Sequence, residues 1–170
     1  MHVPFNNMPA ESRVWIYQAD RQLSEEEVSE IRAVAENFTA QWSAHSRDLM
    51  ASCDLIKNRF LILAVNEQAH NASGCSIDAS VRFVQTLEQK YQLSFLDRHI
   101  ICFEETDGSL FSLSRKDIPE SVENGRVTEN TLTFDNLVSS IADFNSKWKK
   151  KAGETWLKKY FSNLHKSVLN

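Results

Sequence analysis

The sequence predicts an α+β fold with a ferredoxin-like core, and three observations lead to that prediction. A helix-capping signature opens an amphipathic segment at Ser24, an unbroken apolar run follows at 60–65, and a second amphipathic segment follows that run. Segments of strand character flank the two helical segments, so the order over residues 13–104 is βαββαβ. We expect an antiparallel sheet in which the first strand pairs with the third and the fourth.

Length, composition and charge narrow the class of protein. The chain has 170 residues, 42% of them hydrophobic and 25% charged, and its net charge is −4. These values are typical of one soluble globular domain, and the acidic balance does not favour a nucleic-acid partner. No apolar run approaches the ~18 residues of a membrane span, and residues 1–10 lack the pattern of a signal peptide. Three irregularly spaced cysteines predict neither a disulfide framework nor a zinc site, and they fit a reducing cytoplasm.

The first strand and the first helix are predicted from local signals. Residues 13–18 are rich in β-branched and aromatic side chains, which favours a strand. Ser24 and Glu27 have the spacing of a capping box, in which each side chain bonds the backbone of the other residue. Apolar residues then recur every three or four positions as far as Trp42, so we expect the helix to reach about His45.

The remaining elements of the predicted core follow in order. Residues 49–57 alternate imperfectly but favour a strand, and the Lys-Asn pair after them indicates a hairpin turn. The run at 60–65 predicts a central strand that is buried on both faces. An apolar stripe from Ile77 to Tyr91 predicts the second helix, and residues 99–104 predict the fourth strand.

The C-terminal third predicts an extension of this core. Asp107-Gly108 indicates a hairpin with an extra strand at 110–113, and residues 115–132 are expected to be irregular. Two helices should follow, one from about Asp135 and one that carries Trp156. We expect a single domain over residues 1–170, in which residues 105–170 pack on the 13–104 core. Trp148 and Trp156 should then be largely buried.

The stretch Ala72–Ser80 contains the candidate site, because chemically active side chains crowd the predicted start of the second helix. The backbone N–H groups at a helix start are unpaired, so this end attracts anions and can lower the pKa of a cysteine. The residues expected to bind a ligand are Ser73, Gly74, Ser76, Asp78 and Arg13, and the expected nucleophile is Cys75.

The predicted topology brings further groups to this stretch. In a ferredoxin-like sheet the end of the first helix and the start of the second share one edge. That edge would receive His45, Arg13 and Glu104. A thiol needs a base or a cation to react as thiolate, so Cys75 and His45 are the candidate catalytic pair.

Each of these residues also has a structural interpretation. Ser73 or Ser76 can serve as an N-cap, and Gly74 can supply a positive φ in a tight turn. Cys75 can be a small buried side chain, and His45 can cap the first helix. Cys53 and Cys102 lie on predicted strands and are expected in the core.

Two further features of the sequence bear on function. The chain contains neither Gly-x-x-x-x-Gly-Lys-[Ser/Thr] nor Gly-x-Gly-x-x-Gly, so the sequence predicts no phosphate-cradling loop of these kinds. Lysines and aromatic residues cluster over residues 147–159. This basic-aromatic patch could contact a nucleic acid or an anionic surface, or it could be a solvated helix face.

Several strings of this chain resemble a family of small bacterial proteins that automatic labelling often calls "ABC transporter ATPase". They are Val14-Trp15-Ile16-Tyr17-Gln18, Trp42 followed by His45, Ala72-Ser73-Gly74-Cys75-Ser76-Ile77-Asp78 and, more weakly, Trp156. The family has no established activity, so the resemblance implies no mechanism. An ABC ATPase needs the phosphate-binding loop that this sequence lacks, and we therefore do not expect one here.

The leading hypothesis is a cytoplasmic binding or interaction module whose site is the Ser73–Asp78 loop at the start of the second helix. One alternative is a thiol-dependent enzyme that uses Cys75 and His45, and another is an adaptor that uses the patch at 147–159. We expect no cofactor and no metal, and a small molecule or a protein as the partner, with a homodimer compatible with the sequence. The enzyme requires an exposed Cys75 within hydrogen-bond reach of His45, whereas a binding module does not.

Overall fold

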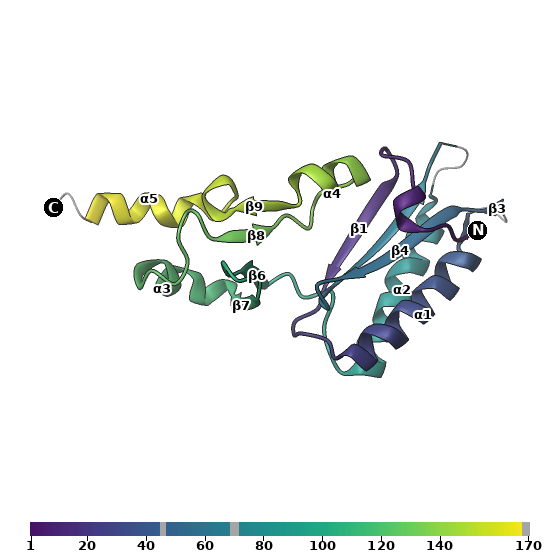
Figure 1. The fold of residues 1–170 in the computed structure, drawn as a ribbon, viewed down its shortest axis with the longest axis horizontal. Helices are drawn as coiled ribbons and strands as arrows, with labels where there is room; N and C mark the ends of the chain where they lie inside the picture. The colour runs from purple at the N-terminus through teal and green to yellow at the C-terminus, as the bar shows by residue number, and fades with distance from the viewer. Residues whose placement is uncertain (45–46, 69–71, 168–170) are drawn as a thin grey trace. The chain divides into compact units, whose positions relative to one another are not determined.

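The computed structural model in Figure 1 describes residues 1–44, 47–68 and 72–167. It is a mixed α+β fold, which confirms the predicted class. The chain divides into two compact units, each with a sheet of its own. Unit 1 is Met1–Leu96 with Asn136–Ser146, and unit 2 is Asp97–Asp135 with Lys147–Asn170.

Unit 1 is built on a three-stranded antiparallel sheet in the order β1-β5-β4. Its strands are β1 (Arg13–Gln18), β4 (Met50–Ile56) and β5 (Phe60–Asn66), and a separate short pair is β2 (Ser43–Ala44) with β3 (Arg47–Asp48). Its helices are α1 (Glu25–Gln41), α2 (Gly74–Tyr91) and the 3-10 turn η1 (Phe5–Asn7), and α4 (Ile141–Lys147) lies almost wholly within it.

The central strand β5 is buried on both faces, as its apolar run predicts. Every side chain from Phe60 to Val65 has 0% exposure. Leu61, Leu63 and Val65 face the core beneath α1 and α2, which cover one face of the sheet (Figure 1). Ile62 and Ala64 face a second core, made with η1, α4 and residues beside them. Unit 1 is therefore a three-layer structure with the sheet in the middle.

The turn between β4 and β5 explains how two neighbouring strands of this sheet are joined. Lys57 and Asn58 both have positive φ, 53° and 49°. This is the geometry of a hairpin turn whose twist matches that of the strands it connects. The predicted hairpin at this Lys-Asn pair is thus confirmed.

Unit 2 is built on a four-stranded antiparallel sheet in the order β7-β6-β8-β9. Its strands are β6 (Ile100–Glu104), β7 (Leu110–Ser114), β8 (Leu132–Phe134) and β9 (Lys149–Lys151), and its helical segments are η2 (Arg115–Asp117), α3 (Ile118–Glu123), η3 (Ala152–Glu154) and α5 (Lys158–Ser167). The predicted hairpin joins β6 to β7, and Gly108 adopts a φ of 84° in its turn. The core of this unit includes Phe103, Ile118, Val122 and Phe161.

The predicted pairing of the fourth strand with the first is wrong. β6 pairs with β7 and β8 in unit 2, and the described residues therefore do not form a ferredoxin-like sheet. The outer edge of β1 is instead met by a late segment of the chain. The Val14 N–H donates to the Ser139 carbonyl at 3.0 Å, and the Ile141 N–H donates to the Ser12 carbonyl at 3.0 Å. The boundary between the units consequently precedes β6 and does not follow it.

The C-terminal third also departs from its prediction. The helix expected from Asp135 begins only at Ile141, and α3, β8 and β9 were not predicted, because elements of three to six residues are too short to show a period. Trp148 is buried at 6% exposure, whereas Trp156 is 47% exposed, so the prediction for Trp156 is wrong. Residues 136–146 pack within unit 1, whereas the packing of the rest of 105–170 on the first strands and helices stays a prediction.

The predicted capping box at the start of α1 is confirmed. The Ser24 Oγ accepts the Glu27 N–H at 3.2 Å, and Glu27 accepts the Ser24 N–H at 2.9 Å. Arg21 also binds both carboxylate oxygens of Glu27, at 2.7 and 2.9 Å. The helix start is therefore held by a network of three side chains.

We expect Ser24→Ala to lower the free energy of unfolding by about 0.5–2 kcal/mol, because the substitution removes the acceptor for an unpaired helical N–H. Ser29→Ala, at an exposed position of the same helix, is the matched control and should change stability by less than about 0.5 kcal/mol. Urea denaturation measures both. Equal midpoints for the two variants would contradict a cap at Ser24.

The Glu27 network should also appear in the pH dependence of stability. Hydrogen bonds from Arg21 and from the Ser24 backbone lower the Glu27 pKa from 4.5 to about 2. Because the folded-state pKa is lowered, the ionised Glu27 carboxylate stabilises the fold fully above about pH 4.5. This contribution is lost as the pH falls towards 2. The stability difference between wild type and Glu27→Gln should therefore shrink over this window, and Glu26→Gln controls for the loss of a carboxylate. A difference that stays constant from pH 6 to pH 2 would refute this network.

Candidate functional site

The helix α2 begins at Gly74 because Ser73 caps it. Ser73 has an extended backbone, and its Oγ accepts the Ser76 N–H at 3.2 Å. The Ser76 hydroxyl donates back to the Ser73 carbonyl at 2.8 Å, and the Ile77 N–H donates to the same carbonyl at 3.0 Å. Ser76 is 2% exposed. Both hydroxyls that the sequence offers as ligand groups are thus engaged within the turn itself.

A buried tryptophan connects the end of α1 to the start of α2. The Trp42 indole N–H donates to the Ser76 carbonyl at 2.9 Å. The Trp42 ring also lies against Trp15 and Phe38, with centroid distances of 5.7 and 5.1 Å. The prediction that these two helix ends meet at one edge is therefore confirmed, although the sheet that positions them has three strands.

A carboxylate links the predicted binding residue Arg13 to the loop that precedes α2. Its guanidinium lies 3.7 Å from the Glu67 Oε1, which also accepts the Ala72 N–H at 2.9 Å. The guanidinium also lies over the Trp15 ring, 4.7 Å from the centroid. Arg13 is consequently held beside the residue that precedes the Ser73 cap. Sequence reasoning missed Glu67, which carries no local signal for this bridging role.

Three residues of the predicted site are exposed, namely Gly74, Cys75 and Asp78. Gly74 is helical, so the tight-turn interpretation of this residue is wrong, and a Cβ built there meets no atom within 4 Å. Cys75 is a free, exposed thiol, whereas Cys53 and Cys102 are buried as predicted. In the described part of the chain the Cys75 thiol has no hydrogen bond and no ion pair.

Two other groups were expected at this edge, His45 and Glu104. His45 falls outside the described residues, so the pair of Cys75 and His45 stays a prediction. Glu104 belongs to the sheet of unit 2, where its Oε1 accepts a hydrogen bond from the Lys149 Nζ at 2.8 Å. Across residues 1–44, 47–68 and 72–167, no three His, Cys, Asp or Glu side chains come together in a way that could hold a metal ion.

The basic-aromatic patch predicted at 147–159 is not one uniform surface. Lys149 and Lys150 pair with Glu104 and Asp135, each at 2.8 Å. Lys159 lies over the rings of Trp156 and Tyr160, at 5.4 and 4.9 Å from their centroids. The structure thus separates cations that are neutralised on the sheet from cations that cover aromatic rings.

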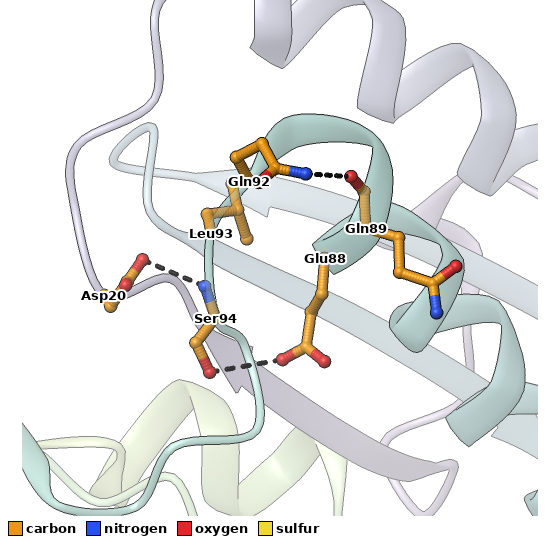
Figure 2. Close-up of a pocket in the computed structure, with 6 residues that line it drawn as sticks. All are labelled: Asp20, Glu88, Gln89, Gln92, Leu93 and Ser94. Atoms are coloured by element: carbon orange, nitrogen blue, oxygen red, sulfur yellow. Dashed lines mark hydrogen bonds between the residues drawn. The ribbon is translucent and has the colours of Figure 1, made fainter.

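A hollow of about 410 Å³ lies at the opposite end of α2 (Figure 2). Its lining residues are Asp20, Glu88, Gln89, Gln92, Leu93 and Ser94. Because a helix rises ~1.5 Å per residue, the hollow is roughly 20 Å from Cys75 along the axis. No motif in the sequence indicates this hollow.

The two carboxylates of the hollow hold the loop that follows α2. The Glu88 Oε1 accepts hydrogen bonds from the Ser94 hydroxyl and from the backbone N–H groups of Phe95 and Leu96, at 3.2, 2.7 and 2.9 Å. The Asp20 Oδ1 accepts the Ser94 N–H at 3.1 Å, and Figure 2 shows both carboxylates directed at this residue. These contacts give the two side chains a structural role.

Comparisons with protein-family models, curated proteins and solved structures find no match to this chain. The resemblance suggested by the Ser-Gly-Cys-Ser-Ile-Asp string therefore stays a prediction. None of the helices in the described ranges is long and apolar enough to span a membrane.

We expect Trp42→Phe to destabilise the protein by about 1–3 kcal/mol, because it keeps an aromatic ring but removes the donor to the buried Ser76 carbonyl. Trp156→Phe, at an exposed position, is the control and should cost less than about 0.5 kcal/mol. Denaturant midpoints give both values. If the two substitutions cost the same, the indole hydrogen bond does not join α1 to α2.

Proposed function

We propose that this protein is a cytoplasmic binding or interaction module. Its contact surface, here called the α2 N-terminal surface, consists of Arg13, Gly74, Cys75 and Asp78. One observation carries the proposal: Cys75 and Asp78 are exposed and the Arg13 side chain is 42% exposed, while the serines of the turn are engaged in capping the helix. A polar partner can contact such a surface without competing for the hydroxyl groups that cap the helix.

The same geometry favours binding over thiol chemistry. A cysteine reacts as thiolate, and an enzyme forms the thiolate with a base or a cation in contact with the sulfur. Among the described residues no such group contacts Cys75, and the Arg13 guanidinium is close to the Glu67 carboxylate at 3.7 Å. The open space around Gly74 also suits a partner that brings a surface of its own.

Thiol labelling should distinguish the two functions. In the native protein we expect a maleimide to modify Cys75 rapidly and the other two cysteines slowly, because both are buried and burial raises the Cys53 pKa to about 11. Under denaturing conditions all three should react. If Cys75 is not activated, His45→Ala should leave its labelling rate unchanged between pH 6 and 8. A rate well above that of free cysteine, lost in His45→Ala, would support the thiol enzyme instead.

A thermal-shift screen tests the binding proposal directly. The probes are a panel of small polar metabolites, because a ligand at 100 times its Kd adds about 2.7 kcal/mol to stability. A ligand of the α2 N-terminal surface should raise the Tm of the wild type, of Cys75→Ser and of Arg82→Ala, an exposed arginine on α2. The shift should disappear in Arg13→Ala and in Asp78→Asn. Ligands that stabilise all variants equally, or that are turned over only when Cys75 is present, would contradict the proposal.

A further inference from the structure

Unit 2 exposes a tryptophan next to residues that it buries. Trp156 is 47% exposed, whereas Leu157 and Phe161 are 1% and 3% exposed and belong to the core. The rings of Trp156 and the half-buried Tyr160 meet in a T-shaped arrangement, with centroids 6.1 Å apart. Large aromatic side chains that remain at the surface are the residues that most often dominate binding energy in protein interfaces.

Two cations from distant parts of the chain converge on this tryptophan. The Arg115 guanidinium, from η2, lies 4.9 Å from the Trp156 ring centroid. The Lys159 ammonium, from α5, lies 5.4 Å from the same centroid and 4.9 Å from that of Tyr160. Arg115, Trp156, Lys159 and Tyr160 are called the cationic-aromatic cluster below.

These cations differ from others in unit 2. Lys149, Lys150 and Arg126 each contact a carboxylate, at 2.8, 2.8 and 2.6 Å. For Arg115 and Lys159, no ion pair occurs within the described ranges of the chain. A cation over a ring keeps its N–H donors available, five on a guanidinium and three on an ammonium. The cluster therefore offers charge and hydrogen-bond donors to an acceptor from outside.

We propose that the cationic-aromatic cluster binds an acidic segment of a partner protein, with its carboxylates on Arg115 and Lys159 and an apolar side chain against Trp156. The planar fork of a guanidinium matches a carboxylate, and the exposed indole supplies apolar area beside it. A nucleic-acid strand fits less well. It needs a continuous basic track, but Lys149 and Lys150 are neutralised by carboxylates.

Selection from a random twelve-residue peptide library on the purified full-length protein tests this inference. We expect enriched peptides to contain aspartate or glutamate beside an apolar residue. Their Kd should rise by at least about tenfold in the double variant Arg115→Gln/Lys159→Gln, and by a similar factor in Trp156→Ala. The matched control is Arg98→Gln/Lys151→Gln, which removes two exposed cations elsewhere in unit 2 and should change the Kd by less than about twofold.

The same variants also test two other kinds of partner, a nucleic acid and an anionic membrane. Unchanged thermal midpoints show that the variants are folded, and both cations are exposed, so their replacement should not disturb the core. Peptides that are not enriched in acidic residues, or that bind the double variant as tightly as the wild type, would overturn the proposal. A fifteen-residue oligothymidylate, or vesicles of phosphatidylserine and phosphatidylcholine, would also overturn it by binding more tightly than every selected peptide and losing affinity in the double variant.

Discussion

The structure of unit 1 depends on the complete burial of β5. A strand with no exposed face cannot satisfy its backbone groups with water, so both of its edges must be paired and both of its faces covered by apolar side chains. β1 and β4 pair its edges, and α1 and α2 cover one face. The second face is completed in part by Ile141, far along the chain, and the adjoining Ser139 also meets the edge of β1. This requirement explains why residues 136–146 belong with the N-terminal strands, while the residues on either side of them build another sheet.

The same constraint positions the candidate site. The helix α2 follows β5 in the chain and covers one face of its sheet, and α2 begins at a turn held by three kinds of contact. These are the Ser73 cap, the Trp42 indole on the Ser76 carbonyl, and the Glu67 carboxylate between Arg13 and the loop backbone. Because the cap and the indole hydrogen bond engage the serines, the groups that remain outside belong to an accessible surface and not to a described catalytic constellation. The proposed binding role rests on this accessible surface.

The cations of unit 2 that are described here fall into two groups: some pair with carboxylates, and others lie over aromatic rings. Each arrangement has a physical reason. Glu104 is only 8% exposed, and a buried carboxylate is costly unless a cation or a donor compensates it, which Lys149 does. Arg115 and Lys159 lie at the surface, where the aromatic rings attract them without neutralising them. The pair that Lys149 forms with the buried Glu104 therefore serves the fold. Arg115, Lys159 and Trp156 form the proposed contact with an acidic partner.

Signals that act over a few residues were readable from the sequence alone. They include the capping box at Ser24, the Lys-Asn and Asp-Gly turns, the apolar run of β5 and a serine cap at the start of α2, because each depends on neighbours along the chain. The sequence also indicated that the ends of α1 and α2 share an edge. Only the tertiary structure decided that β6 joins another sheet, that Glu67 bridges Arg13 to the loop, and that Trp156 stays exposed. These features depend on contacts between residues far apart in the chain, and such contacts leave no periodicity or local motif by which they could be predicted.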